Sequence, residues 1–88
     1  MRPIYFLLLL MWPFAIAAQS KKANEEIIAG NTAYKEQQYA KAEETYLKAL
    51  SADPKSAIAK YNLATALYKQ DRKVEAAQAY QQVAEAAT

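Results

Sequence analysis

Apolar and polar positions in the chain, after its N-terminal stretch, recur with the period of an α-helix. Large apolar or aromatic residues return every three or four positions, among residues that favour helix formation. Polar stretches interrupt this pattern at 36–38, 53–56 and 69–73. In the middle one, Pro54 cannot continue a helix and Ser56 can cap the next one. No segment alternates with the two-residue period of a half-buried strand. The pattern predicts an all-α protein of two helix-turn-helix units.

The two predicted helical hairpins are also similar in sequence. When segment 23–54 is laid over segment 57–88, six positions are identical. The identical pairs are Ala23/Ala57, Tyr34/Tyr68, Lys35/Lys69, Ala42/Ala76, Tyr46/Tyr80 and Ala52/Ala86. An internal repeat of this period is typical of solenoid proteins, in which each repeat buries its apolar face against the next. We therefore predict one repeat at residues 23–56 and a second at 57–88.

Small and aromatic residues occupy matching places in the second helix of each repeat. Ala42, Ala49 and Ala76 allow close approach of paired helices, and we expect Tyr46 and Tyr80 to fill the space between a hairpin and its neighbour. Helical arrays generally need at least three repeats or a cap. Either the chain is a fragment of a longer array, or its last helix meets a partner or a second copy.

The N-terminal segment 1–18 differs in composition from the rest of the chain. A basic residue near the start precedes an apolar run, and small residues follow, as in a secretory signal peptide cleaved here after Ala17 or Ala18. The alternative is a membrane anchor, but the apolar stretch 4–18 is shorter than the roughly 20 residues that a spanning helix needs. We predict a signal peptide at 1–18, a short linker at 19–22 and a periplasmic or secreted protein. An inner-membrane anchor is the alternative.

Composition argues against several classes of function. The chain has no His and no Cys, which removes the usual nucleophile pairs and the commonest metal ligands. Its one glycine, Gly30, leaves no glycine-rich phosphate loop. Removal of Arg2 with the signal leaves ten basic and nine acidic residues, well interspersed, which gives no basis for nucleic-acid binding. We therefore predict no enzyme activity, no cofactor, no metal and no nucleic-acid partner.

At its repeat positions the chain resembles the tetratricopeptide repeat family. The matching residues are Gly30, Asn31, Ala33, Tyr34, Tyr39, Ala42, Tyr46, Ala49 and Pro54, then Tyr61, Asn62, Leu63, Ala64, Leu67, Tyr68, Ala76 and Tyr80. The resemblance covers residues 23–88 and implies an α-solenoid fragment of two repeats. Glu26 and Ala29 depart from large apolar positions of the family, and Gln37 or Asp71 stands where the family has a glycine between helices.

In this family the first helices of successive repeats line a concave groove that holds a peptide or a partner's helix. The resemblance implies the groove residues Ile27, Asn31, Tyr34, Lys35, Ile58, Tyr61, Asn62, Thr65, Tyr68, Lys69 and Arg72. Amides can bond a peptide backbone, tyrosines give rigid contact area, and cationic side chains can meet acidic groups. The alternative is structural: the tyrosines pack against neighbouring helices and the lysines are solvated. Some family members clamp a terminal carboxylate with Lys and Asn, but Ile27 replaces the first such Lys, so we do not expect a clamp.

Residues 18–24, 30–34 and 61–70 are also similar to the small exported repeat proteins of bacterial aerotolerance operons. That similarity implies a scaffold acting beside membrane proteins with von Willebrand factor A domains. We therefore expect a protein-binding adaptor of the bacterial cell envelope. The alternatives are a self-associating module that forms a homo-oligomer through its last helix, residues 74–86, and a membrane-anchored assembly factor.

Overall fold

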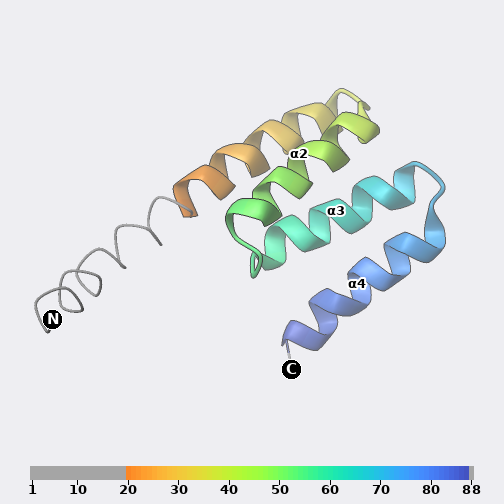
Figure 1. The fold of residues 1–88 in the computed structure, drawn as a ribbon. Coiled ribbons are helices and arrows are strands. Elements are labelled where there is room, and N and C mark those ends of the chain that lie inside the picture. The colour runs from red at the N-terminus through yellow and green to blue at the C-terminus, as the bar shows by residue number, and fades with distance from the viewer. Residues whose placement is uncertain (1–19, 88) are drawn as a thin grey trace, which may run out of the picture.

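The computed structural model describes residues 20–87 of the chain, and these residues are almost entirely helical. The first helical segment comprises residues 20–35; α2 is Tyr39–Ala52, α3 is Ala57–Lys69 and α4 is Lys73–Ala87 (Figure 1). The described residues contain no strand, which confirms the predicted all-α class. Residues 20–22, assigned to a linker from sequence, continue the first helix instead. The predicted signal peptide at 1–18 lies outside the described residues.

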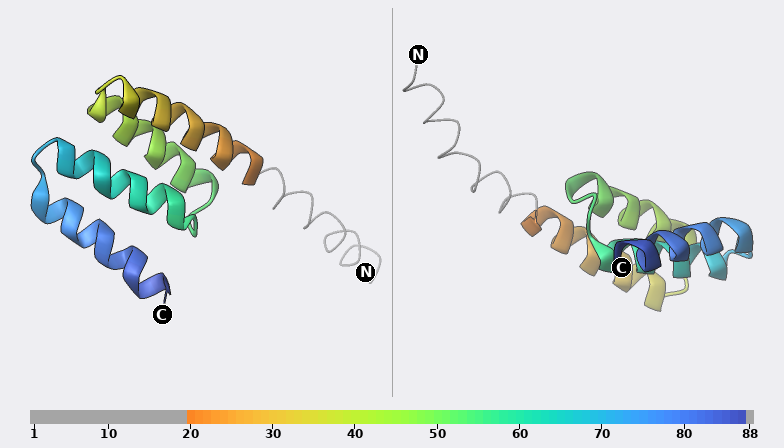
Figure 2. Two further views of the ribbon diagram at one scale, coloured as in Figure 1. Left: turned by 180° about the vertical axis from the view of Figure 1, so that it is seen from behind. Right: turned by 90° about the horizontal axis from the view of Figure 1, so that it is seen from below.

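The four helices form two antiparallel hairpins that lie side by side. The first helical segment and α3 run in the same direction, and α3 lies between α2 and α4 (Figures 1 and 2). Within residues 39–87, α2 and α4 each pack on α3, and no Cα atom of α2 lies within 8 Å of one of α4. Among residues 20–87, none of the helices combines the length and the apolar character that crossing a bilayer requires.

Both hairpins turn through the same helix-ending motif. After the first helix, the Gln37 amide donates to the Tyr34 carbonyl (2.9 Å) and the Gln38 amide to the Ala33 carbonyl (2.9 Å). The same bonds follow α3, from the repeat-equivalent residues Asp71 and Arg72. This pair of hydrogen bonds is a Schellman motif, whose first residue beyond the helix adopts a left-handed conformation. Gln37 (φ 62°) and Asp71 (φ 64°) hold that place, where glycine would have no steric cost.

Replacing Gln37 with glycine should therefore stabilise the protein. A left-handed conformation costs a residue with a Cβ about 1–2 kcal/mol, and the extra freedom of glycine in the unfolded chain offsets part of the gain. We expect Gln37→Gly to raise the free energy of unfolding by about 0.5–1 kcal/mol in urea titrations. Gln38 has a negative φ of −91°. Gln38→Gly is therefore the matched control and should bring no gain.

The connection between the hairpins agrees with the sequence. Helix α2 ends at Ala52, before Pro54, and the Ser56 hydroxyl accepts a hydrogen bond from the Ala59 amide (3.2 Å) at the start of α3. Ser56 thus satisfies one of the amides that the first turn of a helix leaves without a partner. The predicted cap at Ser56 is confirmed.

The core is built mainly from alanines around one large side chain. One buried cluster joins Ala33, Ala42, Tyr46 and Ala66, with Leu63 packed against it. Ala42 and Ala49 are fully buried, Ala76 nearly so, and Tyr46 is 2% exposed. The predicted close approach at the alanines is confirmed, as is the packing of Tyr46 against the second hairpin. Its counterpart Tyr80 is only half-buried.

Candidate interaction groove

A depression of about 170 Å³ opens between the two hairpins, on the side of the first helix and α3. Its lining residues are Asn31, Tyr34, Tyr46, Tyr61, Asn62 and Thr65. They come from the first helical segment, α2 and α3. Amides, hydroxyls and aromatic rings form this surface, which we call the amide groove.

Gly30 fixes the position of the Tyr46 ring beneath the amide groove. A Cβ atom on Gly30 would lie 2.5 Å from Cε1 and 2.7 Å from Cδ1 of Tyr46, well inside van der Waals contact. The absence of a side chain on Gly30 therefore lets the ring pass against the first helix. The Tyr46 hydroxyl then reaches Asn31 and donates to its Oδ1 (2.6 Å).

Asn31 and Asn62 are joined across the two hairpins. Asn62 Nδ2 donates to Asn31 Oδ1 (3.1 Å), so this oxygen accepts two hydrogen bonds, one from Tyr46 and one from Asn62. Neither Asn31 Nδ2 nor Asn62 Oδ1 has a partner among residues 20–87, and both side chains are half-buried beside the open depression. The pair thus presents one donor and one acceptor outward, the complement of a peptide unit.

The second hairpin contains a counterpart of the Tyr46–Asn31 hydrogen bond, with a different acceptor residue. Thr65 is the repeat counterpart of Asn31, and its hydroxyl lies 2.9 Å from that of Tyr80. Because Thr65 already donates to the Tyr61 carbonyl (3.1 Å), its oxygen accepts from Tyr80. The Tyr80 ring also meets Tyr61 edge to face, with centroids 5.4 Å apart. These contacts fix Tyr61 and Thr65 at the edge of the amide groove.

Five of the eleven residues predicted for the groove line the amide groove: Asn31, Tyr34, Tyr61, Asn62 and Thr65. Three more, Lys35, Tyr68 and Lys69, are exposed near the C-terminal ends of the first helix and α3, outside the depression. Tyr46 was predicted from sequence as a core residue and not as part of the groove wall. The signal for its second role was the spacing of Gly30 from Tyr46, which matches that of Ala64 from Tyr80.

Two of the predicted positions are corrected by the structure. Ile27 does not face the groove: it is 9% exposed and packs in a core cluster with Ala49 and Ala59. An aliphatic side chain has no polar tip to keep in water, so burial stabilises it fully. Arg72 lies beyond the end of α3 and binds Glu43 (2.8 Å) and Glu75, away from the amide groove.

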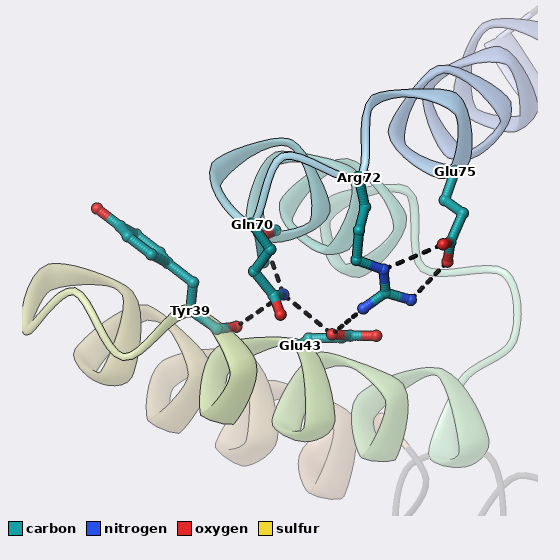
Figure 3. Close-up of polar contacts among 6 residues, drawn as sticks. Tyr39, Glu43, Gln70, Arg72 and Glu75 are labelled. Carbon is teal, nitrogen blue, oxygen red and sulfur yellow. Dashed lines mark hydrogen bonds and ion pairs between the residues drawn. The ribbon is translucent and has the colours of Figure 1, made fainter.

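Figure 3 shows the polar cluster to which Arg72 belongs. Glu43 Oε1 accepts from Arg72 and from Gln70 Nε2 (3.0 Å), and Gln70 also donates to the Tyr39 and Ala66 carbonyls. The pKa of Glu75 is lowered, mainly by its hydrogen bond from Arg72. The cluster joins the end of α3 to α2, on the face opposite the amide groove.

The face of the amide groove carries positive charge and no carboxylate. By helical spacing, Asn24, Ile28 and Lys35 share the side of the first helix that bears Asn31. On α3 the same side bears Ile58 and Lys69 with Asn62 and Thr65; no position on either side is acidic. Among the described residues neither Lys35 nor Lys69 has an acidic partner. Lys35 and Lys69 are repeat-equivalent and are the last residues of the first helical segment and of α3, which run in the same direction (Figure 1).

Burial of Tyr46 predicts a stability loss at alkaline pH. Its pKa is raised, first by burial and second by the nearby Tyr34. The folded chain therefore holds the neutral hydroxyl, and the unfolded chain ionises first, at the ordinary tyrosine pKa of about 10. Stability should thus fall as the pH rises above about 10. In urea titrations over this range, the free energy of unfolding of Tyr46→Phe should fall less with rising pH than that of the wild type. An equal fall in both proteins would contradict the attribution of this loss to Tyr46.

Within residues 20–87 no group of acidic side chains is arranged to hold a metal ion. The structure instead defines a class, the α-solenoid repeats, in which stacked helical hairpins present a shared concave surface. The sequence profile of the tetratricopeptide repeat matches residues 29–88, so the chain belongs to the tetratricopeptide repeat family. No curated protein matches the chain significantly. Members of this family are typically protein-interaction modules without enzyme activity.

Proposed function

We propose that the amide groove binds an extended, acidic segment of a partner protein. The observation that carries this proposal is the outward donor and acceptor of the Asn31–Asn62 pair in an open depression. Because Asn31 Oδ1 is held by two internal bonds, the amide orientation is fixed before a ligand arrives. A preorganised pair loses little side-chain entropy on binding.

Charge and apolar area define the segment further. Lys35 and Lys69, free of carboxylate partners in the described part of the chain, would attract an acidic side chain at one end of the groove. Tyr61 and Ile58 are 54% and 63% exposed on the same face of α3 and offer contact area for an apolar side chain. The proposed ligand therefore combines an apolar residue with one or more Asp or Glu residues.

Asn31→Asp tests the outward amide without removing the internal bonds. The carboxylate still accepts from Tyr46 and Asn62, whereas Asn31→Ala would also leave the Tyr46 hydroxyl without its acceptor. We expect Asn31→Asp to weaken binding of a synthetic peptide that combines an apolar residue with Asp and Glu by about tenfold or more in calorimetric titration, equal to about 1.4 kcal/mol.

Asn24→Asp is the matched control for charge, because Asn24 is exposed two turns earlier on the same side of the helix. It should change affinity much less than Asn31→Asp. A peptide with Lys in place of Asp and Glu should bind at least about tenfold more weakly than the acidic one. Equal affinity of the Asn31→Asp variant and the wild type, or of the two peptides, would refute the proposal.

We also propose that this adaptor works in the bacterial cell envelope after export. The support is the signal-like order of residues 1–18 and the similarity to exported repeat proteins of aerotolerance operons. Membrane proteins with von Willebrand factor A domains would then be the candidate partners. Mass spectrometry of the protein's N-terminus in a bacterial host would test cleavage after Ala17 or Ala18, and an intact apolar stretch would favour the anchored alternative.

A further inference from the structure

A second groove lies on the opposite side of α3, and its chemistry differs from that of the amide groove. It has a volume of about 280 Å³ and is bounded by α2 and α4, whose Cα atoms stay more than 8 Å apart, with α3 as its floor. Leu63 and Leu67 form part of that floor, on the side of α3 turned away from Tyr61 and Thr65. We call this surface the leucine groove.

The leucine groove combines apolar area with negative charge. Leu47 of α2 lines it and is 47% exposed, beside Leu63 and Leu67. Its charged lining groups are two carboxylates, Glu43 and Glu75, and one guanidinium already bound to both, so the lining has a net charge of −1 (Figure 3). The Glu75 side chain is 54% exposed and can accept a further cation.

We propose that the leucine groove docks a basic amphipathic helix from a second partner, so that the chain bridges two proteins through opposite faces of α3. Apolar side chains of that helix would pack on Leu47, and a Lys or Arg beside them would pair with Glu75. The volume is below the roughly 300–1,000 Å³ of small-molecule sites, which favours anchoring side chains of a protein over a free ligand. Docking in the leucine groove does not depend on the function assigned to the amide groove; only the bridging of two proteins rests on that proposed function.

A pair of synthetic peptides tests this docking site on the full chain. One is an amphipathic helix with a leucine face flanked by lysines; its match has glutamates in place of the lysines. The lysine peptide should shift the backbone NMR signals of Leu47, Gln78 and Gln82, residues that line the leucine groove. The glutamate peptide should bind at least about tenfold more weakly.

Two exposed apolar residues on opposite faces of the protein provide matched variants. Leu47→Gln should weaken binding of the lysine peptide by about tenfold. Ile58→Gln, on the face of the amide groove, should leave the affinity for the lysine peptide unchanged. Equal binding of both peptides, no binding at millimolar concentration, or insensitivity to Leu47→Gln overturns the proposal. NMR shifts of Leu47 that grow with protein concentration in the absence of peptide also overturn the proposal, because a second copy of the chain would then fill the leucine groove. Loss of acidic-peptide binding alone would refute only the amide groove.

Discussion

Tyr46→Ala should unfold the chain at room temperature. Tyr46 is the one fully buried large side chain among the described residues, and it contacts both hairpins through Ala33, Ala42 and Ala66. Truncation of a buried aromatic residue to alanine costs about 3–5 kcal/mol. A core of this size supplies about 3–5 kcal/mol of stability in total. The expected loss is thus as large as the whole stability of the fold.

Far-UV circular dichroism with urea titration measures this loss, and the repeat itself supplies the control. Tyr80 is the repeat counterpart of Tyr46, but it is half-buried. Tyr80→Ala should therefore lower the free energy of unfolding by clearly less than Tyr46→Ala. If the two substitutions cost the same, the junction between the hairpins does not depend on Tyr46 as the structure indicates.

The fold was predictable because local signals agree along the chain. Helical periodicity, the break at Pro54 and the Ser56 cap each specify the same boundaries, and the structure follows them. The helical conformation of residues 20–22 was not predictable, since these residues are polar and carry no strong helix signal. The turns carried a weaker signal, because Gln37 and Asp71 adopt the left-handed conformation without being glycine.

The site was predictable only in part, because spacing gives the side of a helix and not the depth of a side chain. Asn31 and Asn62 line the amide groove, but their mutual hydrogen bond depends on how two hairpins pack, which no local pattern encodes. Ile27 has the same register as Tyr61 and yet is buried. Arg72 extends the pattern of α3 but lies beyond the helix end, where Glu43 and Glu75 hold it on the other face.

Both grooves depend on where α3 sits between its neighbours. One face of α3 carries Asn62, bonded to the first helix, and the opposite face carries Leu67, which lines the leucine groove. A change that shifts the first hairpin relative to α3 should therefore alter both surfaces. Within that hairpin the Tyr46 ring lies so close to Gly30 that a Cβ atom there would come within 2.5 Å of it.

Gly30→Ala should destabilise the protein, against the usual trend for helices. Alanine is better than glycine inside a helix by about 0.8–1 kcal/mol, and Gly30 lies in the helical segment 20–35. The new methyl group, however, would meet three ring atoms of Tyr46 at 2.5–3.0 Å. The buried ring is rigid, so the helix or the ring must shift, at a cost of about 1–3 kcal/mol for an overpacked core.

The sign of the effect separates helix propensity from packing. Thr32→Ala, at an exposed position of the same helix, also improves helix propensity and meets no buried ring, so it should be neutral or slightly stabilising. Gly30→Ala should instead lower the urea midpoint and weaken the Tyr46–Asn31 hydrogen bond, seen as a changed NMR signal of the Asn31 side-chain amide. A stabilised Gly30→Ala variant would mean that the Tyr46 ring does not lie against Gly30. In that case Tyr46 would also not orient Asn31 toward a ligand.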